Sequence, residues 1–278
     1  MTSLSETIAY RLLRLLSHSC SRLTEAQISA KVEQRAYQPD RPRWFLDLVG
    51  EYIDYRNKTV LDIGCGYGDL CITLAKAGVK RAVGVDVDRV RIDCAWRNAK
   101  TEGVQDFVDF EYADFKDYVP VERFNLVFNL LAFEHILDPL SCLQKVYECL
   151  KEGGTLATLF GPLWWSPYGA HTGGFTRVPW VHVLFPERVV LRVRAENFRP
   201  DDVVERYEDI VGHLNRKTVS RFERYAVEAG FKIRVFRVNP DKDRTRRGIL
   251  QPINSIINAT PILRELGSQL LLAILDKL

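Results

Sequence analysis

Residues 60–68 read Val60-Leu61-Asp62-Ile63-Gly64-Cys65-Gly66-Tyr67-Gly68, an apolar run followed by a glycine-rich loop. The apolar run predicts a buried strand, and the residues after the loop predict a helix. Glycine has no Cβ, so this loop can turn sharply and approach a ligand closely. Open α/β sheets bind ligands at the carboxyl ends of their strands, which is where the loop would lie. The stretch therefore predicts an α/β fold with a ligand site at its first loop.

Short apolar runs continue to alternate with helical patterns along the chain. Strands are expected at Thr59–Ile63, Ala82–Val85, Phe107–Tyr112, Asn125–Leu130 and Thr155–Phe160, and helices at Asp69–Ala77, Arg89–Thr101 and Leu140–Leu150. This alternation predicts a doubly wound, mostly parallel sheet with helices on both faces. A helix at Thr218–Glu228 and a strand at Phe231–Val238 follow. A last antiparallel strand would complete such a sheet, but no run marks its position.

The spacing of the glycines favours one class of ligand. Dinucleotide loops read G-x-G-x-x-G and leave a helix N-terminus open for a pyrophosphate. Here the spacing is G-x-G-x-G, and the place of the third glycine is taken by Asp69, which would repel a diphosphate. Asp62 on the strand would instead attract a cationic amine. A phosphate-free ligand with a positively charged amino acid end fits better than NAD, which favours S-adenosylmethionine (SAM).

Two further acids follow the next two strands. Asp86 ends the second strand some twenty residues past the loop, where a carboxylate can accept both ribose hydroxyls. Asp114 follows the third strand and could accept a hydrogen bond from the adenine amino group. Val87 and Phe115 would cover the faces of the adenine ring. The alternative for each acid is a helix N-cap or a turn. Three acids at successive strand ends are more specific than any one of them.

With these motifs, the chain resembles the small-molecule type of the class I SAM-dependent methyltransferase superfamily over roughly residues 55–160. The resemblance is carried by VLDIGCGYG, GVD at 84–86, ADF at 113–115, FNLVFNLLAFEHILDP at 124–139 and LKEGGTL at 150–156. It implies a seven-stranded sheet and SAM as cofactor, with Asn129 against the methionine end. The expected cofactor residues are Asp62, Gly64, Cys65, Gly66, Gly68, Asp86, Val87, Asp114, Phe115 and Asn129.

A cation site of some relatives is incomplete in this sequence. Proteins that resemble ubiquinone-pathway O-methyltransferases bind a cation with Glu-x-x-Glu-His, whereas this chain has Leu131-Ala132-Phe133-Glu134-His135. Because the first acid is missing, we predict no metal. For the Glu134-His135 pair itself, a structural role is favoured over a catalytic one.

An aromatic segment with several prolines and glycines follows the fifth expected strand, from 161 to about 190. Loops of this length are usually functional or disordered, and this one is too aromatic to be disordered. Core packing is the alternative, because aromatic side chains gain much from burial. We expect the segment to bind substrate through Trp164, Trp165, Tyr168, Phe175 and Trp180.

Methyl transfer from a sulfonium is an in-line displacement in which the protein aligns the reactants and excludes water. A hydroxyl acceptor also needs a base. The candidates are His171 first, then His182, which could equally be packed, and His135, with Tyr168 as an alternative. We expect a small apolar or ring-bearing acceptor and favour O-methylation, with C- or N-methylation as alternatives.

The composition narrows the classes of partner and the location expected for the protein. A net charge of +3 over 278 residues does not indicate nucleic acid. Six cysteines without a CxxC pair indicate neither disulfides nor zinc and favour a cytoplasmic location. No apolar stretch reaches the roughly 18 residues that a membrane span needs.

The chain is expected to have three parts: an N-terminal helical segment (1–55), a SAM-binding domain (56–240) with a substrate-binding insertion or lid (161–215), and a C-terminal helical extension (241–278). The first helix has an apolar stripe, and a second helix is expected at Trp44–Tyr55. The expected extension contains a run of arginines followed by apolar residues at helical spacing. It would pack on the domain or on a second subunit, or lie on a membrane that holds a lipid-linked acceptor. The first-helix stripe is Ile8, Leu12, Leu15 and Leu16; the cationic run is Arg244, Arg246 and Arg247; the C-terminal stripe is Ile262, Leu266, Leu270, Ile274 and Leu278.

Two other classes compete with this interpretation. An NAD(P)-dependent oxidoreductase is disfavoured by the glycine spacing. A catalytically idle SAM-binding scaffold is disfavoured by the intact loop and acids.

Overall fold

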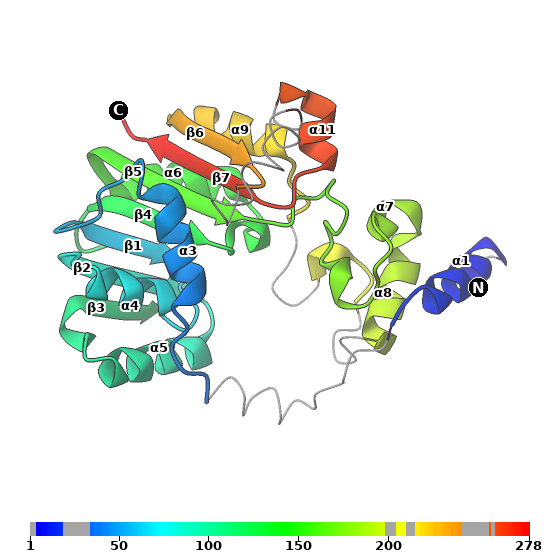
Figure 1. Cartoon of the computed structure of the whole chain (residues 1–278), viewed down its shortest axis with the longest axis horizontal. Coiled ribbons are helices and arrows are strands. Elements are labelled where there is room, and N and C mark those ends of the chain that lie inside the picture. Colours follow the sequence, from blue (N-terminus) through cyan, green and yellow to red (C-terminus); the bar gives the residue numbers. More distant parts are fainter. Residues whose placement is uncertain (1–3, 19–33, 198–203, 210–214, 241–255, 257–258) are drawn as a thin grey trace.

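The computed structural model describes residues 4–18, 34–197, 204–209, 215–240, 256 and 259–278. It contains a seven-stranded sheet in the order β3-β2-β1-β4-β5-β7-β6 (Figure 1). Neighbours from β3 to β5 pair in parallel, and β7 pairs antiparallel with both β5 and β6. This confirms the predicted doubly wound α/β fold. The strands are β1 (Thr59–Ile63), β2 (Arg81–Asp86), β3 (Val108–Tyr112), β4 (Phe124–Leu130), β5 (Leu150–Phe160), β6 (Lys232–Val238) and β7 (Leu271–Asp276).

The sheet has a hydrophobic core on each face. Val60 of β1 belongs to the core that includes α3 (Asp40–Val49), α4 (Asp69–Lys76) and α5 (Arg89–Thr101). The next residue, Leu61, belongs to the core that includes α6 (Pro139–Cys149) and α9 (Val219–Glu228). Successive side chains of a strand point to opposite faces, so a strand buried on both faces must be apolar throughout. That requirement explains the continuous apolar run before the glycine loop.

The end of the chain forms the last antiparallel strand, and the prediction of a helix there is wrong. α11 (Pro261–Leu266) begins after Thr260, but β7 then enters the sheet between β5 and β6. Burial on both faces of the sheet outweighed the helical spacing of the C-terminal stripe. The buried residues of β7 alternate between the two cores: Leu271, Ala273 and Leu275 in one, Leu272 and Ile274 in the other. The cationic run 244–247 lies outside the described residues.

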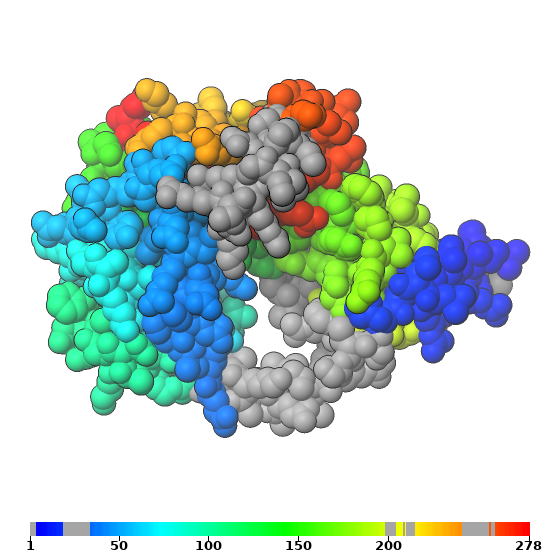
Figure 2. Space-filling model, in the orientation of Figure 1, coloured from blue at the N-terminus to red at the C-terminus, as the bar shows by residue number. Residues whose placement is uncertain are grey.

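The first helix packs on the insertion after β5. Leu13 of α1 (Leu4–Leu15) is buried in a third core with residues of α7 (Val181–Leu184) and α8 (Glu187–Asn197). α3 instead packs on the sheet, where Phe45 makes an edge contact with Phe128. Residues 1–55 are therefore not one structural unit, and Figure 2 shows α1 projecting beyond the insertion. The predicted apolar stripe of α1 is exposed: Ile8, Leu12, Leu15 and Leu16.

Short 3-10 turns complete the described structure: η1 (Gln105–Phe107), η2 (Phe133–His135), η3 (Thr172–Gly174) and η4 (Tyr207–Asp209). Within the described ranges, no helix is both long and apolar enough to cross a membrane. The five cysteines in these ranges are unpaired, and Cys20 lies outside them.

Candidate active site

The glycine loop connects β1 to α4, and each glycine in it has a positive φ. A Cβ on Gly64 would lie 2.5 Å from the Cβ of Ala132, and one on Gly68 would lie 2.9 Å from the Cβ of Ala95. These two glycines allow close packing of the loop. A Cβ on Gly66 would meet nothing within 4 Å. The loop therefore faces open space at Gly66, where a ligand can approach the backbone.

Asp86 at the end of β2 shapes this loop. One carboxylate oxygen accepts a hydrogen bond from the backbone N–H of Gly66 at 2.8 Å, and the other accepts one from the backbone N–H of Asp88 at 2.9 Å. A carboxylate has about four acceptor positions, so two remain for a ligand. Asp86 thus joins the glycine loop to the position predicted for the ribose diol.

Asp62 lies beneath the loop and is almost fully buried. Burial raises the pKa of Asp62 to about 7, helped by the charges of Asp86 and Asp69, while a hydrogen bond from Cys71 opposes the shift. A neighbouring ammonium would favour the ionised carboxylate. The geometry and this pKa fit a cationic amine as the ligand group beside Asp62.

SAM binding is expected to strengthen roughly tenfold as the pH rises from about 6 to about 7.5, because Asp62 ionises over this range. The α-amino group of SAM stays largely protonated below about pH 7.5, so it does not produce the change. Calorimetric titration at several pH values measures the effect. Asp62→Asn should remove the pH dependence and keep the low-pH affinity. A wild-type affinity that is constant with pH would contradict the role of Asp62.

Arg35 covers the loop from the N-terminal side, a contact that the sequence did not reveal. It forms an ion pair with Asp69 at 2.6 Å and lies 4.0 Å from the centre of the Tyr67 ring. Its Nη1 is buried without a hydrogen-bond partner among the described residues. The ion pair offsets the negative charge that was expected to repel a diphosphate, so the choice of ligand depends on Asp62 and the glycine spacing. The unused donor could hold a carboxylate.

Asp114 is half exposed at the end of β3 and forms an ion pair with Lys116 at 3.0 Å. Although partial burial alone would raise the pKa of Asp114, hydrogen bonds from Lys116 lower it. Val87 is largely exposed beside the end of β2 and could cover an adenine ring. Phe115 is buried in the core against Tyr118, so it offers little ring surface to a ligand, contrary to the prediction.

Asn129 and Cys65, two of the predicted cofactor residues, have contacts within the protein. Asn129 is buried, donating to the carbonyl of Ile63 at 2.9 Å and accepting from the Thr158 hydroxyl at 3.2 Å. It therefore joins β1, β4 and β5. Cys65 is also buried, and a Cβ on Gly84 would lie 2.8 Å from its sulfur. Its side chain faces the protein interior, so only its backbone faces the loop.

A cluster of three side chains lies at the end of β4, next to the glycine loop. Glu134 and His135 are in η2, directly after the alanine that touches Gly64, and His171 comes from the insertion. The two imidazole rings stack with their centres 5.5 Å apart. Asn215 fixes the backbone of η2 by donating to the carbonyls of Phe133 and Ile136 at 2.8 and 3.0 Å. The fold thus brings His135 and His171 together.

Glu134 and His171 each have a buried polar atom that no described residue satisfies. These atoms are the Oε2 of Glu134 and the Nε2 of His171. Burial raises the pKa of Glu134 to about 8, although hydrogen bonds from its own N–H and that of Gly161 oppose the shift. Burial, together with the nearby His135 and Arg194, lowers the pKa of His171 to about 4. Unsatisfied buried groups are costly, so this pair is suited to a polar ligand.

The same cluster could hold a metal ion. Ligand atoms of Glu134, His135 and His171 all lie within 4.8 Å of one another, and no other such group was found in the described part of the chain. Two imidazoles and one carboxylate suit transition metals better than magnesium. The sequence analysis favoured a structural role for Glu134. Its position four residues after the fourth strand, at the ligand-binding edge of the sheet, was the signal that could have indicated a functional role.

His182 is not part of this cluster. It is buried, and its Nε2 lies 2.6 Å from the carbonyl of Trp164. Burial lowers the pKa of His182. The packed alternative therefore holds, and His182 supports Trp164.

The predicted substrate aromatics have different locations. Trp164 and Trp165 line a cavity of about 480 Å³ beside α9. Phe175 is fully buried in the third core, which contradicts its predicted role. Tyr168 donates to the carbonyl of Arg177 at 3.0 Å, and the indole of Trp180 donates to the carbonyl of Trp165 at 2.9 Å. Neither of these two lines the cavity.

Comparison with known proteins relates one segment of the chain to a protein family. Residues 54–159 match a protein family described as a methyltransferase domain. This segment contains the glycine loop, Asp86, Asp114, Glu134 and His135, but not His171. The seven-stranded sheet and the matched domain are together typical of class I SAM-dependent methyltransferases, a class whose cofactor is SAM.

Individual relatives match part of the chain. A ribosomal protein L11 methyltransferase of Shewanella halifaxensis is 35% identical over 107 residues, which are 38% of this chain and 34% of that protein. A ubiquinone biosynthesis O-methyltransferase of Actinobacillus pleuropneumoniae is 33% identical over 105 residues, 36% of this chain and 44% of that protein. The matched segments thus span less than half of either relative. Their names refer to unlike processes, so these matches do not select an acceptor.

The fold is shared more widely. A protein of Listeria monocytogenes, assigned to the SAM-dependent methyltransferases, superposes with a TM-score of 0.58 at 20% identity. The superposition covers 85% of this chain and 98% of that chain. At this identity the comparison establishes the fold alone.

Proposed function

We propose that this protein transfers the methyl group of SAM to a hydroxyl oxygen of a small molecule. The observation that carries the proposal is the unsatisfied pair of buried atoms on Glu134 and His171, next to the glycine loop. A hydroxyl group can donate its proton to the ionised Glu134 Oε2 and accept a hydrogen bond from His171 when the imidazole carries its proton on Nε2. The pair would thus hold an acceptor hydroxyl close to the bound cofactor.

In this reaction the acceptor oxygen attacks the methyl carbon of SAM as the carbon–sulfur bond breaks. The bonding electrons go to sulfur, leaving S-adenosylhomocysteine, and the hydroxyl proton goes to the carboxylate of Glu134. A base with a pKa of about 8 is well matched to this task at neutral to slightly alkaline pH. His171 is neutral at these pH values, and with the proton on Nε2 it donates a hydrogen bond to the acceptor oxygen and positions it. The protein's main contribution is alignment.

The proposed transfer uses no metal. The proton has an acceptor in Glu134, and the charge that moves to sulfur neutralises the sulfonium, so no anion needs stabilising. The donor set around Glu134 makes this a testable point, because a bound cation would occupy the base.

Two measurements test the proposed function. Calorimetry should show uptake of SAM and S-adenosylhomocysteine and none of NADH. Methyl-labelled SAM, incubated with the protein and a panel of phenols, alcohols and a cell extract, should give a labelled product that is unchanged by EDTA. Uptake of NADH alone would indicate an oxidoreductase, and SAM binding without any labelled product would indicate an idle scaffold. Activity lost to EDTA and restored by zinc or manganese would overturn the metal-free mechanism.

A further inference from the structure

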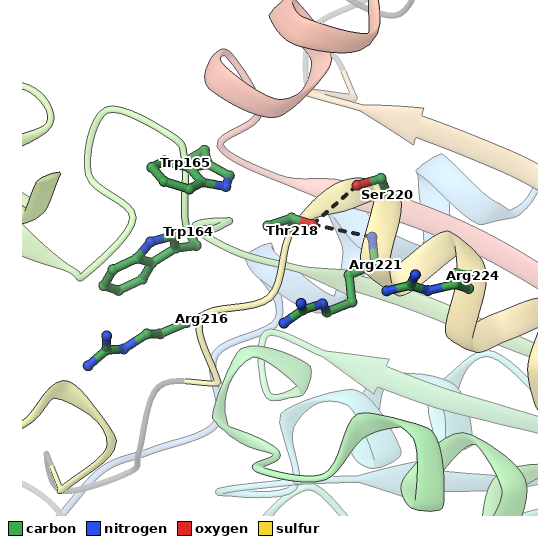
Figure 3. A pocket seen from close by; sticks show the side chains of 7 residues that line it. All are labelled: Trp164, Trp165, Arg216, Thr218, Ser220, Arg221 and Arg224. Atoms are coloured by element: carbon green, nitrogen blue, oxygen red, sulfur yellow. Dashed lines mark hydrogen bonds between the residues drawn. The ribbon is translucent and has the colours of Figure 1, made fainter.

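A cavity of about 480 Å³ opens between the insertion and α9. Figure 3 shows Trp164 and Trp165 on one side of it and the first residues of α9 on the other. Its volume lies within the range of small-molecule sites. Its lining contains two indole rings, two hydroxyls and three guanidinium groups, and no carboxylate: Trp164, Trp165, Arg216, Thr218, Ser220, Arg221 and Arg224.

The three arginines differ in what they already bind. Arg216 pairs with Glu187 at 2.7 Å, and its guanidinium lies 5.0 Å from the centre of the Trp164 ring. Figure 3 shows its side chain turned away from α9, beside that ring. Arg216 therefore supports one wall, and its charge is largely offset.

Arg221 and Arg224 carry the uncompensated charge of the cavity. Within the described ranges, neither forms an ion pair with a carboxylate. They are three residues apart on α9, so they share one face of the helix. Burial lowers the pKa of the neighbouring Lys217, and the positive charge of Arg221 acts in the same direction.

Carboxylates near this end of α9 are committed to other partners. Glu223 pairs with Arg264 at 2.5 Å. Glu265 accepts the N–H groups of Val219 and Ser220 at 3.0 and 2.8 Å. The backbone N–H groups at the helix start are thus already satisfied, so a ligand in the cavity would bind to the arginine side chains.

We infer that this cavity binds a phosphate group of the methyl acceptor, with an apolar or ring-bearing part against the two indoles. Two unpaired guanidinium groups supply a charge of +2, which matches a phosphate ester at −1.5 to −2 and exceeds that of a carboxylate. The planar donor fork of arginine also suits phosphate oxygens. This inference rests on the proposed function and specifies its substrate class: a phosphorylated small molecule or a lipid-linked phosphate.

The cavity is placed to present such an acceptor to the transfer site. Trp164 and Arg216 also line a second, much smaller hollow of about 10 Å³, which Glu134 lines as well. The cavity and Glu134 therefore adjoin the same two residues, Trp164 and Arg216. The carbonyl of Trp164, held by the buried His182, keeps this wall in place.

Phenyl phosphate is the first probe, because it combines a ring with a dianion. Calorimetry should show that it binds more tightly than benzoate, and that phenol binds weakest. Arg221→Gln and Arg224→Gln should each weaken its binding by about 10- to 100-fold, the loss expected for a charge-assisted hydrogen bond. Arg56→Gln is the matched control, because Arg56 is exposed before the start of β1, at the opposite end of the strands. It should leave the binding unchanged.

The outcomes separate this inference from the proposed function. SAM binding of each arginine variant, measured in parallel, shows that the variant is folded. Equal affinity for phenyl phosphate in wild type and in the double variant would overturn the phosphate site while leaving methyl transfer intact. Arginine-dependent phosphate binding by a protein that ignores SAM would keep the site and remove the proposed function. Arginine-dependent sedimentation with phosphatidic acid vesicles, but not with phosphatidylcholine vesicles, would support a lipid-linked phosphate; binding of phenyl phosphate alone would support a soluble one.

Discussion

Glu134→Gln is expected to lower kcat for methyl transfer by about 100- to 10,000-fold, the usual contribution of a general base. Glutamine has nearly the same shape as glutamate and keeps an oxygen for the N–H groups of Glu134 and Gly161, but it cannot take the proton of the acceptor. The affinity for SAM should stay close to that of the wild type, because Glu134 lies on the acceptor side of the glycine loop.

The pH profile distinguishes a base from a structural carboxyl. A base must be ionised, so the wild-type kcat should rise with pH toward the pKa of Glu134 of about 8 and then level off. This rise should be absent in Glu134→Gln and partly restored in Glu134→Asp. Glu148→Gln, an exposed position on α6, is the control. A Glu134→Gln protein with the wild-type rate, or with the same rise in kcat, would contradict the proposed role.

Asp86→Asn is expected to weaken SAM binding by about 100-fold or more, as at least one charge-assisted hydrogen bond is lost and the carboxylate charge disappears. In the structure both oxygens of Asp86 are used, by Gly66 and by Asp88. An amide NH₂ cannot accept from either N–H group. The variant must therefore give up a contact that shapes the loop or one that holds the ribose.

Asp88→Asn is a close control for this variant. Asp88 is the N-cap of α5 and accepts the N–H groups of Val90 and Arg91. Asparagine caps helices about as well as aspartate, so this substitution should preserve both stability and SAM affinity. Calorimetry on both variants, with thermal unfolding to check the fold, measures the difference. Equal losses in the two variants would indicate a general effect of charge at this edge of the sheet.

The cofactor half of the site was largely readable from the sequence because its determinants are local. Strand, loop and helix follow one another within residues 59–76, and Asp86 and Asp114 end the next two strands. In a parallel sheet these strand ends meet at one edge, so their order along the chain already implies a site. The same logic failed for Phe115, because a strand pattern does not show whether a side chain after its end faces the ligand or the core.

The acceptor half depended on contacts between distant parts of the chain. Phe175 and Trp164 belong to the same aromatic segment, yet one is buried in the third core and the other lines a cavity, because α1 covers the first and α9 faces the second. Glu134 became a candidate base only when His171 was found beside it, 37 positions later in the sequence.

Local sequence alone thus determined the order of strands and helices, the glycine loop and the acids around it, since each depends on neighbours along the chain. Tertiary structure alone decided that residues 271–276 form a strand, that α1 belongs with the insertion, and that Arg221 and Arg224 face two tryptophans. The physical reason is burial: short apolar runs can satisfy either a helix or a strand, and only the surfaces available in the folded chain select between them.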